Sequence, residues 1–109
     1  MQKRTCFCFM MIFSWQLFAE NVFLRNNATL ETVAVENSLS LGYGSKVSEI
    51  RFENKNPKIT KITLEGTAFI QDYSFIAECK ELEILVLNDV TVENLEFLSS
   101  CKKLRILVL

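Results

Sequence analysis

The chain has 109 residues, which is room for a single domain, and half of them are apolar. Its 12 basic and 13 acidic residues give a formal charge of −1, and it contains no histidine. Ser-His and Cys-His nucleophiles and histidine-ligated metals are therefore excluded, and the sequence has no P-loop or CxxC motif. We expect no enzyme activity and no cofactor. The nearest group of carboxylates has the spacing of a solvated face: Asp72, Glu78, Glu81 and Glu83.

The first 19 residues have the pattern of a secretory signal peptide. Lys3 and Arg4 supply a positive start, the 14 residues from Thr5 to Phe18 are almost all apolar, and Ala19 is a small residue at the expected cleavage point. Because this run is shorter than the ~20 residues that a helix needs to cross a bilayer, we expect cleavage, with an uncleaved membrane anchor as the alternative. The product is then secreted, periplasmic or held at the cell surface, with no membrane insertion.

Cleavage leaves ten basic and 13 acidic residues, a formal charge of about −3 with the two signs interspersed. A nucleic-acid partner requires clustered basic side chains that displace counterions from phosphates. The one local cluster, Lys102, Lys103 and Arg105, is small. We therefore expect no nucleic-acid partner.

The C-terminal half contains an internal repeat. The segment Cys79–Leu87 recurs as Cys101–Leu109 at an offset of 22 residues, with seven of nine positions identical. An earlier copy lies at an offset of 23, where Ile59, Ile62 and Leu64 match Leu82, Leu85 and Leu87. The repeats therefore run from residue 58 to residue 109, as two complete units and one further strand.

Each copy reads L-x-x-L-x-L, followed by a polar turn and apolar residues at every third position. Alternation such as Leu85 and Leu87 predicts a strand with one buried face, and the spacing of Val92, Leu95 and Leu98 predicts a short helix or 3₁₀ segment. A unit this short cannot bury a core alone. We therefore expect the units to stack, with their strands in a parallel sheet and their helical segments along the opposite wall.

This pattern resembles the leucine-rich-repeat family, and the 22-residue spacing is similar to that of internalin-type bacterial surface proteins. The resemblance covers Ile59 to Leu109, about half the chain. It implies an α/β fold, a short curved solenoid of parallel strands and helical segments, whose inner face binds a protein or peptide. One position departs from the pattern: the usual turn asparagine is replaced by Thr67 and Val90, so we expect an irregular turn ladder.

Short β-like runs separated by turn-forming residues lie between the signal peptide and the repeats. They predict a β-rich N-terminal cap at residues 29–57, preceded by a loose tail at residues 20–28. Terminal units of repeat proteins need such a cover. We expect the run Val47–Phe52 to pair directly beside Ile59–Leu64.

Several strand positions that face away from the predicted core carry aliphatic side chains, where polar ones are usual. A contiguous exposed apolar patch usually marks an interaction surface. The alternative is that a neighbouring segment or a second copy covers these residues as ordinary core. The predicted protein-binding residues are Glu83, Ile84, Val86, Arg105, Ile106 and Val108.

Cys79 and Cys101 hold equivalent positions in consecutive repeats, so stacking brings them close together. An oxidising compartment permits a disulfide at such a separation. Cysteine at an inward-facing repeat position more often acts as a small buried apolar residue, so we expect reduced, buried thiols. Asn27-Ala28-Thr29 matches the acceptor pattern for N-glycosylation, which matters only in a eukaryotic source.

The last residue, Leu109, ends a repeat strand, which leaves an unpaired edge. Three explanations compete: a chain truncated from a longer repeat protein, a dimer formed through Leu104–Leu109, or capture of a partner's strand. The leading functional prediction is an exported protein-binding module. The alternatives are a self-associating structural component of the cell envelope and a fragment of a longer repeat protein.

Overall fold

A computed structural model describes residues 20–109, so the predicted signal peptide lies outside the described residues. This part of the chain contains no helix long and apolar enough to span a membrane. Two of its elements are five-residue 3₁₀ segments, η1 (Ser74–Glu78) and η2 (Glu96–Ser100). Its strands are β1 (Glu20–Asn26), β2 (Thr29–Val35), β3 (Ser38–Leu41), β4 (Val47–Phe52), β5 (Lys61–Glu65), β6 (Ile84–Asn88) and β7 (Ile106–Val108).

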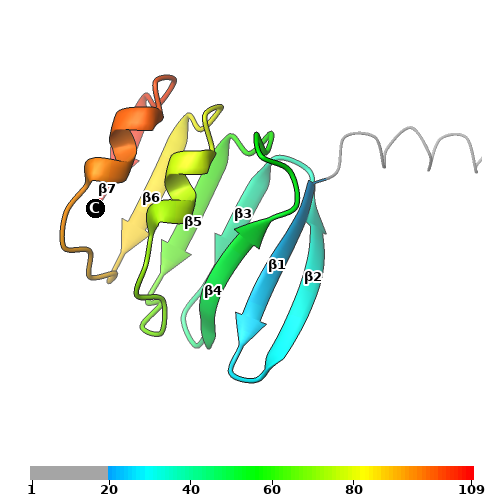
Figure 1. The fold of residues 1–109 in the computed structure, drawn as a ribbon. Coiled ribbons are helices and arrows are strands. Elements are labelled where there is room, and N and C mark those ends of the chain that lie inside the picture. Colours follow the sequence, from blue (N-terminus) through cyan, green and yellow to red (C-terminus); the bar gives the residue numbers. More distant parts are fainter. Residues whose placement is uncertain (1–19) are drawn as a thin grey trace, which may run out of the picture.

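The strands form two sheets (Figure 1). One is antiparallel in the order β2-β1-β4, and the other is parallel in the order β3-β5-β6-β7. In the parallel sheet, Leu85 lies beside Ile62 on β5 and beside Leu107 on β7. The segments η1 and η2 contact each other, and η1 also contacts β4. The second layer therefore consists of the antiparallel sheet and the two 3₁₀ segments.

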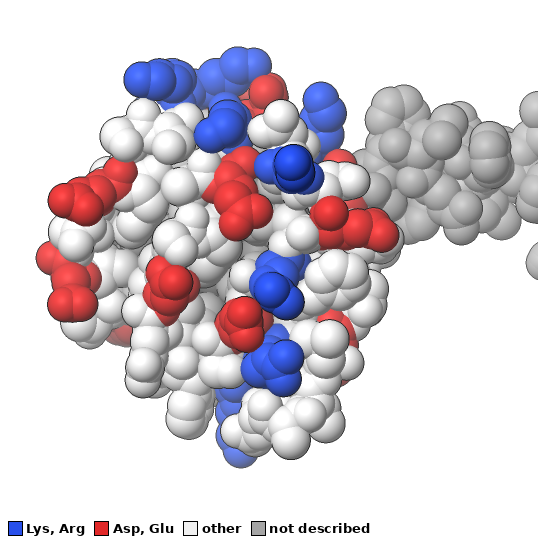
Figure 2. Space-filling view, viewed as in Figure 1, with Lys and Arg blue, Asp and Glu red and all other residues white. Residues whose placement is uncertain are grey.

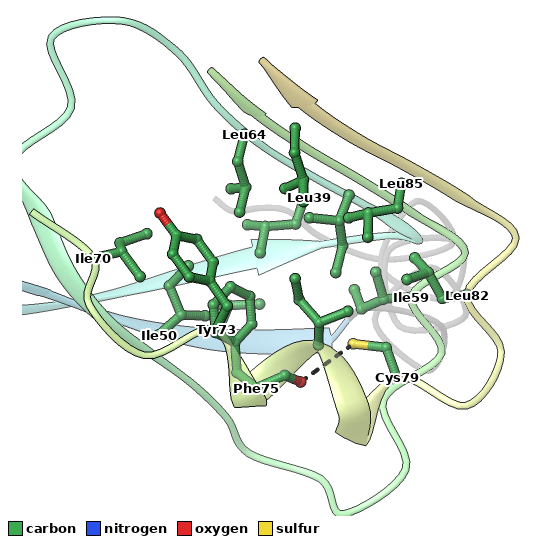
Figure 3. Close-up of a cluster of buried hydrophobic side chains, with 14 of the residues drawn as sticks. Leu39, Ile50, Ile59, Leu64, Ile70, Tyr73, Phe75, Cys79, Leu82 and Leu85 are labelled. Carbon is green, nitrogen blue, oxygen red and sulfur yellow. Dashed lines mark hydrogen bonds between the residues drawn. The ribbon is translucent and has the colours of Figure 1, made fainter. Parts of the chain in front are cut away.

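A single apolar core fills the space between the layers (Figure 3). From the parallel sheet come side chains such as Leu39, Leu64 and Leu85, which are 0–3% exposed because alternate residues of each strand face inward. The antiparallel sheet contributes a second group that includes Ile50. The rings of Phe52 and Phe75, with centroids 6.2 Å apart, join β4 to η1.

The predicted fold class, an α/β leucine-rich-repeat solenoid, is wrong. The regular secondary structure of residues 20–109 is mostly strand, in one antiparallel and one parallel sheet, and its helical content is limited to η1 and η2. The three-residue spacing is the period of a 3₁₀ turn, as the bonds from the amide of Leu98 to Leu95 O and from the amide of Cys101 to Leu98 O show. The antiparallel sheet supplies much of the opposite wall that the helices were expected to form, which produces a small two-sheet globule.

The N-terminal segment also differs from the prediction. Within the expected loose tail, residues 20–28, β1 buries Val22 and Leu24 in the core. The run Val47–Phe52 pairs antiparallel with β1, and the position beside β5 belongs to β3, where Leu39 lies next to Ile62. The residues expected to form the cap therefore supply β3 of the parallel sheet and the outer strands β2 and β4 of the second sheet, whose central strand β1 comes from the expected loose tail.

Leu85 and Leu107 hold the same repeat position, but Leu85 is 0% exposed and Leu107 is 39% exposed. We expect Leu85→Ala to lower the free energy of unfolding by ~2–5 kcal/mol, because it leaves a cavity in the centre of the core. Leu107→Ala is the matched control and should cost about half as much, since its side chain already meets solvent. Urea denaturation measures both values, and equal losses would contradict this assignment of the core.

Candidate functional site

The structure places four of the six predicted protein-binding residues on the adjacent strands β6 and β7, and the other two, Glu83 and Arg105, directly before these strands. In the register of β6 and β7, Ile84 lies beside Ile106 and Val86 lies beside Val108. These four aliphatic side chains alternate with the inward-facing leucines, so they point away from the core together. We call them the β6–β7 patch.

The β6–β7 patch is partly open to solvent in the described part of the chain. Ile106 is 40% exposed and Val108 is 42% exposed, whereas Ile84 and Val86 are half-buried. The neighbouring positions on β5 are not aliphatic, because Lys61 pairs with Ile84 and Thr63 pairs with Val86. Polar residues of β5 therefore bound the patch on one side. Its other side is formed by β7, the last strand of the parallel sheet in the described residues.

Glu83 and Arg105 directly precede β6 and β7 and form an ion pair. Arg105 Nε donates to Glu83 Oε1 at 3.2 Å, and the Arg105 amide donates to Glu83 O at 2.9 Å. Both side chains are more than 40% exposed, so the ion pair adds little to stability. Its effect on the patch is to place one acidic and one basic group at the same end.

Sequence reasoning missed a second ion pair of the same kind. Lys103 Nζ donates to Glu81 Oε1 at 2.7 Å, and this hydrogen bond lowers the pKa of Glu81 and raises the pKa of Lys103. The signal was present in the repeat, since opposite charges occupy positions 22 residues apart in both pairs. Parallel pairing at the repeat offset brings such residues side by side.

The carboxylates considered for catalysis do not converge. Glu81 and Glu83 are bound in the two ion pairs, and Glu78 is exposed at the end of η1. Asp72 Oδ1 accepts a hydrogen bond from the Ser74 amide at 2.9 Å, which lowers the pKa of Asp72 and stabilises the turn that leads into η1. Within residues 20–109, no group of three His, Cys, Asp or Glu side chains is placed to hold a metal ion.

Cys79 and Cys101 are both free and buried, as the sequence predicted. Figure 3 shows the Cys79 thiol directed at Phe75 O, at 4.0 Å, and Cys101 Sγ lies 3.5 Å from Ile76 O. Burial raises the pKa of Cys79 from its ordinary value of 9.0 to about 12. The two cysteines act as packing residues beneath the sheet.

Tyr43 forms a latch across the carboxyl ends of the strands, which sequence reasoning also missed. Its hydroxyl donates to Asp89 Oδ2 at 2.6 Å, which raises the pKa of Tyr43. Its ring covers Gly66, where a Cβ would lie 2.5 Å from Tyr43 Cδ1 and where φ is +62°. Glycine at position 66 thus allows the loop after β3 to hold the ends of β5 and β6.

Asn27, the predicted glycosylation acceptor, lies in the turn between β1 and β2 and is exposed. Its φ of +54° is in the left-handed region that asparagine tolerates better than most residues. The local backbone accounts for asparagine at this position without any modification.

Comparison of the chain with protein-family models, with curated proteins and with solved structures finds no match.

Because the folded pKa of Cys79 lies above its ordinary value, its burial stabilises the fold below pH 9.0, and this contribution is lost as the pH rises toward 12. We expect the free energy of unfolding to fall as the pH rises between about 8 and 10. Cys79→Ala should show a shallower fall, because only the unfolded wild-type chain gains a thiolate at this position. Denaturant titrations of both proteins measure the two slopes, and equal slopes would show that Cys79 is not buried.

The Tyr43 latch predicts that Gly66→Ala is more costly than Gly44→Ala. Both glycines have positive φ, +62° and +87°, but a Cβ at Gly44 meets nothing within 4 Å. We expect about 1 kcal/mol for Gly44→Ala and about 2–3 kcal/mol for Gly66→Ala, which must also displace the Tyr43 ring. In a Tyr43→Ala background, denaturation should show that Gly66→Ala costs about as much free energy of unfolding as Gly44→Ala. A cost of Gly66→Ala that stays higher in this background would disprove the contact.

Proposed function

We propose that this chain is a protein-binding module that docks a protein or peptide ligand on the β6–β7 patch. The observation that carries the proposal is the row of four adjacent aliphatic side chains on a face of the sheet that is polar one strand away, on β5. Burying such a patch against a ligand is favourable in proportion to the apolar area removed from water. Patches of this kind are typical of interaction surfaces.

The charges around the patch fit a docking surface. Glu83 and Arg105 lie at one end and Lys61 lies along one side, so an apolar centre is flanked by charged groups that can orient a ligand. On the side of the molecule that carries η1 and η2, Figure 2 shows basic and acidic side chains interspersed, with basic ones gathered where the strands of the parallel sheet begin. This side lies opposite the β6–β7 patch, and its charges do not form, in this view, the continuous basic surface that a nucleic acid requires.

Export and the resemblance of residues 59–109 to leucine-rich repeats both stay predictions. If residues 1–19 direct secretion, the ligand is met in the periplasm, at the cell surface or outside the cell. Self-association as a structural component of the cell envelope is the second candidate. It is favoured by the outward-facing aliphatic side chains of β7, since Ile106 and Val108 are about 40% exposed.

A displayed peptide library selected against the protein without residues 1–19 tests this function. We expect selected ligands to bind Ile84→Ser/Ile106→Ser at least tenfold more weakly, because two of the four aliphatic side chains of the patch become polar. Urea denaturation of the variant must show that the fold is retained.

Leu30→Ser/Val33→Ser is the matched control for this experiment. These side chains are 57% and 37% exposed on β2, and they lie outside the β6–β7 patch. Ligands should bind this control as they bind wild type. Equal weakening by both double variants, or loss of the fold in Ile84→Ser/Ile106→Ser, would show that the patch is not a docking surface.

A further inference from the structure

The strand β2 forms one edge of the antiparallel sheet, because β1 is its only neighbour among the described strands. The elements before and after β2 in the chain set this edge: β1 pairs with β2 as a hairpin, and β3 belongs to the other sheet. In Figure 1, β2 and β7 lie at opposite ends of the molecule. The β2 edge is therefore remote from the β6–β7 patch.

The backbone groups of every second residue of β2 point away from β1. In an antiparallel ladder, successive residues of a strand direct their N–H and C=O groups to opposite sides. On β1, Asn21 O accepts from the Glu53 amide at the end of β4, at 3.1 Å, so Asn21 faces β4. The next residue, Val22, then faces β2, where it pairs with Val33. The residues of β2 that alternate with Val33, and so face the open side, are Leu30, Thr32 and Ala34.

The β2 edge lacks most of the features that keep edge strands from pairing. Such strands are usually short, or they carry lysine, proline or a bulge. In contrast, β2 has seven residues, its ladder with β1 has no register shift, and its one charged residue is Glu31. Six of its seven residues are exposed, among them Leu30 at 57% and Val33 at 37%. No described element therefore stands in the way of another strand.

A second copy of β2 matches this edge when the two strands run antiparallel about a two-fold axis at Thr32. Thr32 then lies opposite the Thr32 of the second copy, and Leu30 lies opposite Ala34. These are the residues whose backbone groups face the open side, so each of their N–H and C=O groups finds a partner. A Thr–Thr pair is also a favourable cross-strand contact.

The position of Glu31 favours this register over its neighbours. Glu31 lies opposite Val33 of the second copy, and the two Glu31 carboxylates are diagonal neighbours that stay in solvent. A shift by two residues in one direction places Glu31 directly opposite Glu31, which is destabilising. The shift in the other direction sets Leu30 opposite Glu36, beyond the end of β2. Pairing about Thr32 is therefore the register that uses the whole strand.

We propose that two copies of the chain form a closed dimer by antiparallel pairing of their β2 strands about Thr32, which joins their two antiparallel sheets into one. The pairing uses the open side of β2 in both copies, so the assembly stops at two. A single pair of strands buries a small area by the standard of protein interfaces, and the dimer is therefore reversible. The inference goes beyond the proposed function, because it uses the other sheet and leaves both β6–β7 patches free.

The first experiment measures molar mass by light scattering over a range of concentrations, for the protein without residues 1–19 and for its Thr32→Pro variant. We expect the wild-type protein to pass from monomer to dimer. Proline removes the Thr32 N–H, which faces the open side and takes no part in pairing with β1. We therefore expect the variant to keep its fold in urea denaturation and to dimerise at least tenfold more weakly.

Disulfide cross-linking tests the register. Opposite residues of a hydrogen-bonded antiparallel pair have Cα atoms ~5.5 Å apart, which a disulfide can span. Thr32→Cys should therefore cross-link to its own copy under mild oxidation. Leu30→Cys is the matched control, since it should not cross-link alone but should cross-link to Ala34→Cys when the two variants are mixed. The native Cys79 and Cys101 are buried and should not react.

Four outcomes would overturn the inference: a monomer at every concentration, an open-ended series of sizes, a Thr32→Pro variant that dimerises as wild type does, or cross-linking of Leu30→Cys alone in preference to Thr32→Cys. The cross-links decide the question even if Thr32→Pro does not fold.

The dimer and the proposed function can fail separately. Ile84→Ser/Ile106→Ser should dimerise as wild type does, because both residues lie on the other sheet. Loss of the dimer in that variant would count against pairing through β2. A monomeric protein whose selected ligands still depend on Ile84 and Ile106 would leave the proposed function standing.

Discussion

Parallel pairing of β5, β6 and β7 puts each residue beside its counterpart in the next repeat, and both faces of the sheet follow from that register. On the inner face it stacks Ile62, Leu85 and Leu107, which builds the core one strand at a time. On the outer face it sets Ile84 beside Ile106 and turns isolated aliphatic residues into a patch. A slip of one residue would exchange the two faces, so the patch exists only as long as the core holds this register.

The antiparallel sheet matters to the site because it completes the core beneath it. The parallel sheet has one apolar face that must be covered, and the short segments η1 and η2 cover only part of it. Val22 and Ile50 cover the rest from β1 and β4. The N-terminal half therefore supports the β6–β7 patch indirectly, because it holds in place the strands that carry the patch. The Tyr43 latch adds a polar contact at the strand ends.

The β6–β7 patch combines two kinds of contact. Its outward-facing aliphatic side chains offer apolar area, and the Glu83–Arg105 ion pair at one end of it offers charge of both signs. A ligand that used both would gain apolar contacts from the patch and orientation from the charges.

Local pattern alone determined the repeat. Each repeat must bury the same side chains, and this need explains the alternation at Leu85 and Leu87, the offset of 22 residues and the buried cysteines. The sequence could therefore predict the parallel strands, the composition of the patch and the free thiols. Only the tertiary structure decided which strand lies beside β5 and what forms the opposite wall. The run Val47–Phe52 is as apolar as Ser38–Leu41, and propensity does not choose between them. The choice depends on long-range pairing with β1, whose burial of Val22 and Leu24 gives the antiparallel sheet its place in the core.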